Sequence, residues 1–205
     1  MEALFMKNLI RILTYLLLIF VFGCAGTSIK RVETQETIDL SGKWNDTDSR
    51  LVSEEMVNDA LKRPWITRFM KENKGNLPTV IVGTVKNRSH EHINVQTFVK
   101  DLERALINSG EVEFVASKAE REELREERKD QASRASEVTA KAEGEEIGAD
   151  FMLKGTINTI EDKISGKSVM FYQVNLELIN IETNKKVWIG EKKIKKFIKK
   201  SRFGL

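Results

Sequence analysis

The side chains that could carry catalytic or metal chemistry are few in this sequence. The chain has one cysteine, Cys24, and two histidines, His90 and His92. A catalytic triad needs a histidine beside a nucleophile, and a catalytic zinc site usually needs three protein ligands, so these enzyme classes have few candidate residues. No glycine-rich segment has the spacing of a phosphate-binding loop or a dinucleotide fingerprint. We therefore predict a protein that is not an enzyme and holds no cofactor and no metal.

The segment His90-Glu91-His92 is the one stretch whose residue types could serve as metal ligands. Two imidazoles and a carboxylate are ligand types that zinc accepts, but no second cluster of suitable residues stands out as their complement. A loop that leads into a helix capped by Asn94 explains the same residues as well, and we favour that interpretation.

Cys24 stands where an N-terminal apolar run stops. Lys7 and Arg11 precede the mostly apolar run 12–22, which is shorter than the roughly 20 residues that a bilayer crossing needs. The run ends in Val-Phe-Gly-Cys, which resembles the bacterial lipobox, where the cysteine thiol receives diacylglycerol. We predict a signal peptide over residues 1–23 and lipid on Cys24. The alternative is an uncleaved anchor helix with an incidental thiol.

Residues 24–50 are polar and show no sustained period of two or 3.6 residues, so we expect a flexible tether. Some 20 to 25 such residues span at most about 70–90 Å and average about 25–30 Å as a coil. Residues 51–205 are enough for one globular domain, whose core must suffice without a disulfide because no second cysteine exists.

Helical spacing of apolar residues predicts several helices in this domain. The signals begin at Ser53, resume after Pro64, start again after Asn94, and reappear with a capping box at Ser117 that opens a helix with almost no apolar face. That charged helix is a solvated surface element or a face for an oppositely charged partner, and we favour the first. A further helix is expected from about Arg134.

The remaining pattern predicts strands near 79–85, 112–115, 151–160, 169–181 and 187–197. These elements predict a single compact α/β (α+β) domain with a mixed central sheet flanked by helices in two or three layers. The last strand lies in the segment 185–202, which has nine basic residues and one acid, Glu191. We expect a solvated edge strand with outward lysines. Attraction to anionic lipid headgroups or to an acidic partner is the alternative.

Five short segments resemble, in order, those of the penicillin-binding protein activator LpoB family, within the wider TolB N-terminal and CsgG-like group. They are LSGKWNDTDSR (40–50), RPWI (63–66), VKNRSHEHI (85–93), IGAD (147–150) and VWIG (187–190). The resemblance covers about residues 38–196. It implies an outer-membrane lipoprotein that faces the periplasm, binds a class A penicillin-binding protein, and activates peptidoglycan synthesis without being an enzyme.

Trp44 and Arg50 are the candidate residues for partner contact, because a Trp in a polar tether has no obvious core to join. The alternative is that both pack back on the domain. We expect a monomer that meets no nucleic acid. A second hypothesis is a CsgG-like assembly lipoprotein that forms rings, but the strands lack the sustained lipid-facing alternation of a membrane barrel.

Overall fold

The computed structural model describes residues 6–8, 27–135 and 146–200. The described residues from 37 onward form one compact unit, and every helix and strand below belongs to it. Residues 27–45 contain neither helix nor strand. The helix expected from about Arg134 falls largely on residues 136–145, which lie outside the described residues.

Three of the four helices begin at a residue that their local sequence explains. Asn45 and Ser117 each form a capping box. Asn94 caps the helix that begins at Val95, because its side-chain oxygen accepts a hydrogen bond from the Gln96 N–H. That helix ends at Gly110, whose φ of 69° is a left-handed conformation that glycine adopts without strain. The helices are α2 (Asp46–Leu61), α3 (Trp65–Glu72), α4 (Val95–Ser109) and α5 (Lys118–Arg134).

Five strands form one mixed sheet in the order β2-β1-β3-β4-β5. The strand β1 pairs in parallel with β2 and β3, whereas β3, β4 and β5 form an antiparallel meander. The strands are β1 (Thr79–Asn87), β2 (Glu113–Phe114), β3 (Phe151–Ile164), β4 (Lys167–Asn180) and β5 (Lys186–Lys199). The edge position of β5 confirms the predicted edge strand.

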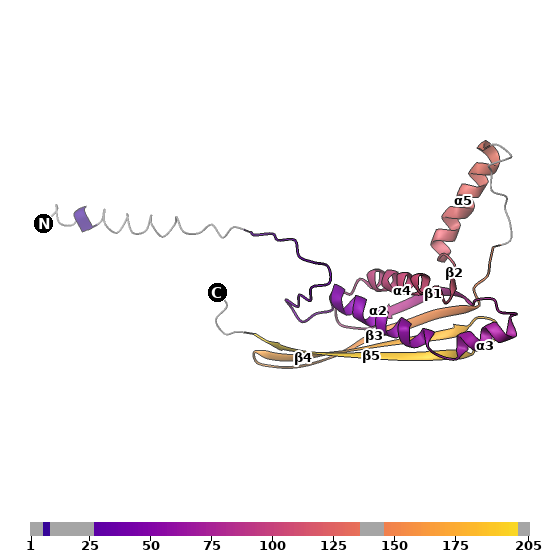
Figure 1. Ribbon diagram of the computed structural model, residues 1–205. Helices are drawn as coiled ribbons and strands as arrows, with labels where there is room; N and C mark the ends of the chain where they lie inside the picture. The colour runs from indigo at the N-terminus through magenta and orange to yellow at the C-terminus, as the bar shows by residue number, and fades with distance from the viewer. Residues whose placement is uncertain (1–5, 9–26, 136–145, 201–205) are drawn as a thin grey trace. The chain divides into compact units, whose positions relative to one another are not determined.

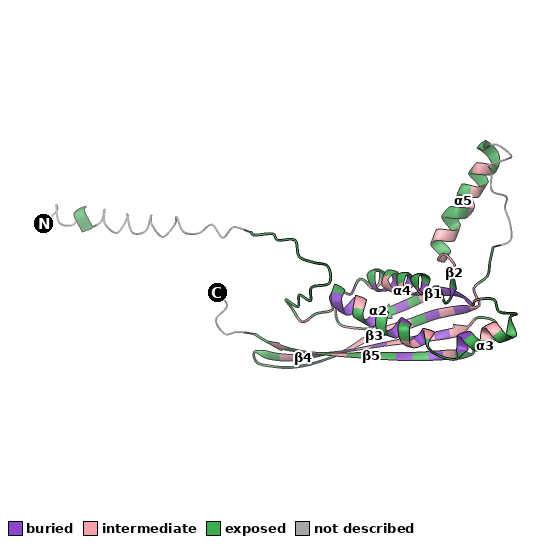
Figure 2. Cartoon of the chain, viewed as in Figure 1, coloured by how far each residue is buried: buried purple, intermediate pink, exposed green. Residues whose placement is uncertain are grey.

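The domain has two layers, and Figure 1 shows α2, α3 and α4 on one face of the sheet. Alternate residues of β4 are buried under these helices, among them Tyr172, Val174 and Leu176. The described residues of the hydrophobic core all lie between Trp44 and Ile198. Figure 2 shows the buried positions gathered between the helices and the sheet, whereas α5 has no buried residue. The predicted α+β fold is confirmed. The sequence left two or three layers open, and the structure has two.

The structure corrects two details. The helix α2 begins at Asp46 and not at Ser53, so its first turns lie in the segment that we assigned to the tether. Its polar residues Thr47 and Asp48 are buried by tertiary contacts that no local pattern reports. The lysines of β5 do not all face outward either, because Lys192 and Lys196 lie on the helix-covered side of the strand.

Candidate functional site

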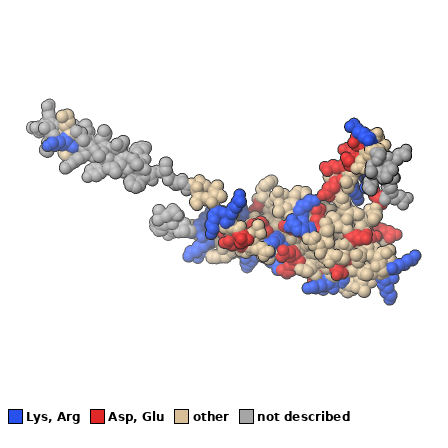
Figure 3. All heavy atoms as spheres, turned by 45° about the horizontal axis from the view of Figure 1, so that its top comes forward, with Lys and Arg blue, Asp and Glu red and all other residues tan. Residues whose placement is uncertain are grey.

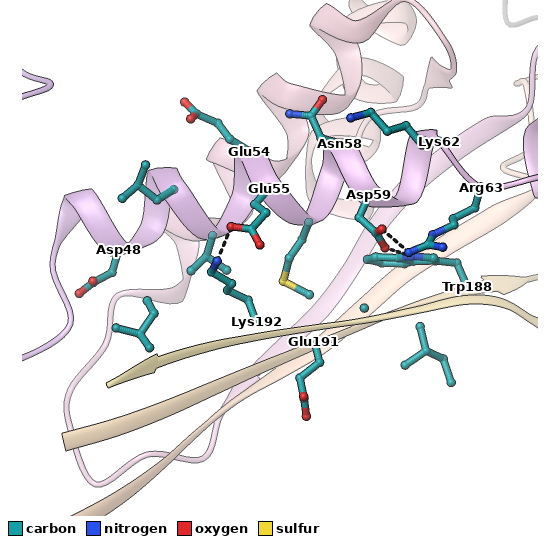
Figure 4. A pocket seen from close by; sticks show the side chains of 16 residues that line it. Asp48, Glu54, Glu55, Asn58, Asp59, Lys62, Arg63, Trp188, Glu191 and Lys192 are labelled. Atoms are coloured by element: carbon teal, nitrogen blue, oxygen red, sulfur yellow. Dashed lines mark hydrogen bonds and ion pairs between the residues drawn. The ribbon is translucent and has the colours of Figure 1, made fainter. Parts of the chain in front are cut away.

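A groove of about 940 Å³ lies between α2 and the edge strand β5 (Figure 4). Val52, Met56 and Trp188 give it an apolar floor, and charged side chains form its rims. Over the face drawn in Figure 3 acidic and basic side chains are interspersed. The rim and wall residues include Asp48, Leu51, Glu54, Glu55, Asn58, Asp59, Lys62, Arg63, Gly190, Glu191, Lys192 and Ile194.

Trp188 and Asp59 close one end of the groove. The indole Nε1 of Trp188 donates to Asp59 Oδ2 at 2.8 Å, and Arg63 forms an ion pair with the same carboxylate. The hydrogen bond from Trp188, followed by the one from Arg63, lowers the pKa of Asp59 below its ordinary value. Gly190 permits this arrangement, because a Cβ there would collide with the Trp188 ring.

The rim residues of α2 point in two directions. Figure 4 shows Lys192 reaching from β5 to Glu55 on α2, which forms an ion pair across the groove. Glu54, Asn58 and Lys62 point away from the strand in the same view. These three polar side chains are therefore accessible at the surface without any change in the groove.

At the N-terminal end of α2, Lys196 gathers three acceptors from different segments. Its Nζ lies 2.6 Å from Asp48 Oδ2, 3.0 Å from Asp39 Oδ2 and 3.1 Å from the backbone oxygen of Lys43. The side chains of Lys196 and Asp48 are only 10% and 9% exposed. Lys196 therefore ties residues 39–43 and α2 to the end of β5.

Trp44 packs onto the same part of the domain. Its ring meets Phe98 and Tyr172 edge to face, with ring centroids 6.0 and 5.5 Å apart, and its Nε1 donates to Ser49 Oγ at 3.2 Å. The Trp44 N–H donates to Glu91 Oε2 at 3.1 Å, and the Tyr172 hydroxyl donates to Glu91 Oε1 at 2.8 Å. Burial, and then the Glu91 carboxylate, raises the pKa of Tyr172.

Arg50 lies on α2 at the surface. Its side chain is 30% exposed, and its guanidinium lies 3.6 Å from Glu54. The next residue, Leu51, lines the groove and is exposed. The structure thus places Arg50 beside the groove and Trp44 against the core, so the two residues do not form one contact patch.

The other residues singled out from the sequence have distinct positions. Cys24 lies outside the described residues. His90 and His92 are exposed, whereas Glu91 between them points to Trp44 and Tyr172. In the described segments, no three His, Cys, Asp or Glu side chains gather as a metal site would require. No helix among the described residues is long and apolar enough to span a bilayer.

Comparison with known proteins identifies the family. The model of the family described as peptidoglycan-synthase activator LpoB matches residues 48–194. The chain belongs to the LpoB family. No curated protein sequence matches the chain. Among solved structures, the LpoB C-terminal domain from Escherichia coli is 16% identical, with a TM-score of 0.46, and the match covers 72% of this chain and 98% of that one.

Two further LpoB structures are similar to the chain. The LpoB C-terminal domain from Salmonella enterica is 16% identical, with a TM-score of 0.43 and the same coverage, 72% of this chain and 98% of that one. The NMR structure of Escherichia coli LpoB is 15% identical, with a TM-score of 0.42, and the match covers 86% of this chain and 83% of that one.

The region matched by the LpoB family contains the groove and Arg50. It begins at Asp48, four residues after Trp44, and ends at Ile194, two residues before Lys196. Asp59, Trp188 and Lys196 were not predicted as structural partners, because each contacts a segment distant in the chain. The alternation of β5 was the available signal, since it places Trp188 and Lys196 on one side of the strand.

Proposed function

We propose that this chain is a lipid-anchored, non-enzymatic regulator that binds and activates a bifunctional class A penicillin-binding protein. It acts from the outer membrane, faces the periplasm, and works as a monomer. The observation that supports this proposal is the LpoB family match over residues 48–194. That region comprises nearly all of α2, the other helices and most of the sheet, so the matched part is the folded domain itself.

Activation of a synthase requires no chemistry from the activator. A ligand that binds the active conformation of an enzyme more tightly than the inactive one shifts the population toward activity. A preference of about 1.4 kcal/mol shifts that equilibrium tenfold. A folded surface with fixed contacts is enough to supply it.

The surface that we assign to this contact is the α2 side of the groove, with Arg50 and its neighbours Leu51 and Glu54. Leu51 is 48% exposed, and Arg50 and Glu54 are both accessible beside it. An apolar side chain next to charged ones is typical of a protein interface. Trp44 remains a second contact candidate, and its packing also holds the segment before α2 against the domain.

The length of the chain before the domain limits where the partner can be. Asp39 is the first residue that an ion pair fixes to β5, and 14 residues lie between it and Cys24. Such a spacer spans at most about 50 Å when fully extended. With lipid on Cys24, Asp39 therefore stays within about 50 Å of the anchoring membrane, and the partner must come within reach of a domain held there.

The decisive experiment measures glycan polymerisation by a purified class A synthase of the same cell, with and without the purified chain. We expect faster polymerisation together with direct binding in a pull-down. If the chain neither binds nor accelerates any class A synthase of that cell, the proposal is wrong. Size-exclusion chromatography addresses the assembly alternative, because a ring-forming lipoprotein elutes as a large oligomer.

The lipid anchor has its own test. Mass spectrometry of the protein extracted from membranes should show a diacylglycerol-modified Cys24, and separation of the two membranes should place it in the outer one. The variant Cys24→Ala should lose the modification. An unmodified wild-type chain would contradict the anchor while leaving the activation assay in solution unaffected.

A further inference from the structure

The face of the sheet opposite the helices, called here the open face, is not covered by any described helix. On its β4 and β5 part the odd-numbered residues point outward, since the even-numbered ones face the helices. Figure 1 shows β4 and β5 extending beyond α2 at the end where β5 finishes. We call this end of the open face the strand tip.

Basic side chains predominate at the strand tip. Lys167 and Lys199 are paired in register, and Lys195 lies opposite Phe171 on the same face. None of these three lysines forms an ion pair with a described residue. One acidic residue, Asp162 of β3, lies on this part of the open face, opposite Val169. The tip therefore presents unneutralised positive charge.

Large apolar side chains stand among these lysines. Ile160 pairs with Phe171, and Val169 pairs with Phe197, so the four side chains form two adjacent rows on the open face. Ile160 and Phe197 are each 66% exposed, and Ile164 at the end of β3 is 73% exposed. Lysines alone can protect an edge strand, so they do not explain why Phe197 of the edge strand and Ile160, two strands away in the neighbouring row, are both exposed.

The chain toward the N-terminus leaves the folded domain at this same end. Asp39 is held at 3.0 Å by Lys196, which lies between Lys195 and Phe197 in the sequence of β5 but points to the helix side of the strand. The fourteen-residue spacer to Cys24 starts there and spans at most about 50 Å. If Cys24 carries the proposed lipid, the spacer joins the domain at the end of β5 that also carries the strand tip.

We propose that the strand tip, with Lys195, Lys199 and Phe197, binds an anionic lipid surface and lays the open face of the sheet against the membrane. Lysines attract anionic headgroups, and aromatic or aliphatic side chains among them enter the headgroup boundary. An acidic protein surface would satisfy the lysines, but the attachment of the anchor at this end favours the membrane. This inference rests on the proposed lipid at Cys24 only for bringing the strand tip close to a membrane. The binding to anionic lipid itself needs no anchor.

The test uses the chain from residue 25 to 205, which lacks the lipid and the apolar run but keeps every described core residue. Cosedimentation with vesicles of phosphatidylethanolamine and phosphatidylglycerol should recover the wild-type chain, and vesicles of phosphatidylcholine alone should recover little. Lys195→Gln/Lys199→Gln should weaken partitioning about 30-fold, since each lysine near such a surface contributes roughly fivefold. Phe197→Ser should weaken it roughly tenfold. Added salt should weaken the wild type more than the lysine variant.

Two matched controls lie on helices away from the open face. Lys118→Gln/Lys129→Gln on α5 removes the same charge, and Ile107→Ser on α4 removes an apolar side chain that is 52% exposed. Both should partition as the wild type does. Equal recovery of the wild type with neutral vesicles, or no loss in the Lys195 and Lys199 variant, would overturn the proposal.

The same variants separate this inference from synthase activation. Lys195→Gln/Lys199→Gln should accelerate glycan polymerisation in detergent solution as the wild type does. A variant that keeps vesicle binding and loses synthase binding would show that the strand tip contacts the protein partner, which also overturns the membrane assignment.

Discussion

Replacement of Lys196 by methionine tests whether the segment before α2 is a fixed part of the domain. Methionine keeps the apolar stem of the side chain and removes the ammonium, which leaves Asp48 without the cation 2.6 Å away. Breaking a buried ion pair by removing one partner costs about 3–5 kcal/mol. The cost here is reduced, because Asp48 Oδ2 still accepts the Asn45 N–H at 3.0 Å and Asp39 is 39% exposed and can hydrate.

We therefore expect Lys196→Met to lower the free energy of unfolding by about 2–4 kcal/mol in urea denaturation at neutral pH. Asp48→Asn in the same chain should recover part of that loss, since it removes the uncompensated charge, and the double-mutant cycle should give a coupling of at least about 1 kcal/mol. Lys195→Met on the open face is the matched control, with a change within about 0.5 kcal/mol. A Lys196→Met variant as stable as this control would refute the reasoning.

Three further predictions concern single side chains. Trp44→Ala should lower the free energy of unfolding by about 2–4 kcal/mol in the same assay, which is less than for a fully buried tryptophan. Trp44→Phe should lower it by less. If Trp44→Phe keeps its stability and loses synthase binding, Trp44 is a partner contact. Arg50→Glu should weaken synthase binding at least fivefold by calorimetry, whereas Lys129→Glu should not. Glu120 has its pKa lowered from 4.5 to about 2 by the hydrogen bond from Lys100 and by Ser117. Its contribution to stability is present above pH 4.5 and lost as the pH falls toward 2, so Glu120→Gln should flatten that part of the acid-unfolding profile, and an unchanged profile would contradict it.

Local signals predicted the elements whose ends are fixed by short-range bonds. Asn94 is the N-cap of α4, as its residue type indicated, and the predicted capping box at Ser117 is formed with Glu120. The strand predicted over 169–181 is found as β4, whose residues alternate between the helix-covered face and the other face of the sheet. These features depend on neighbours within a few residues, so a single sequence contains them.

The start of α2 was mispredicted because its stability comes from distant residues. Asn45 and Asp48 form a capping box in the structure, but no apolar period follows within the first turns. Those turns are buried by Trp44 and by Lys196, which lies about 150 residues further along the chain. A polar segment with such long-range partners has the same local pattern as a tether.

The groove and its surroundings were beyond sequence prediction for a related reason. Asp59 and Trp188 meet only when β5 lies beside α2, and the register of β5 is set by its pairing with β4. Arg50 could be chosen as a contact candidate from its residue type and position. The side of β5 to which Trp188 points could not be predicted until the two faces of the strand were defined.

The placement of the two proposed contacts on different faces has a mechanical consequence. The groove lies on the helix side of β5, with Arg50 beside it on α2, whereas Phe197 and Lys199 lie on the open face. A domain that lies on a membrane through its open face thus keeps α2 available to a synthase, and the short spacer leaves from Asp39 at the membrane end. Membrane contact would then reduce the orientations that the domain samples, which lowers the entropy lost when the partner binds. The anchor and the strand tip would together present α2 to the synthase, so loss of the strand tip should weaken activation on membranes and not in detergent solution.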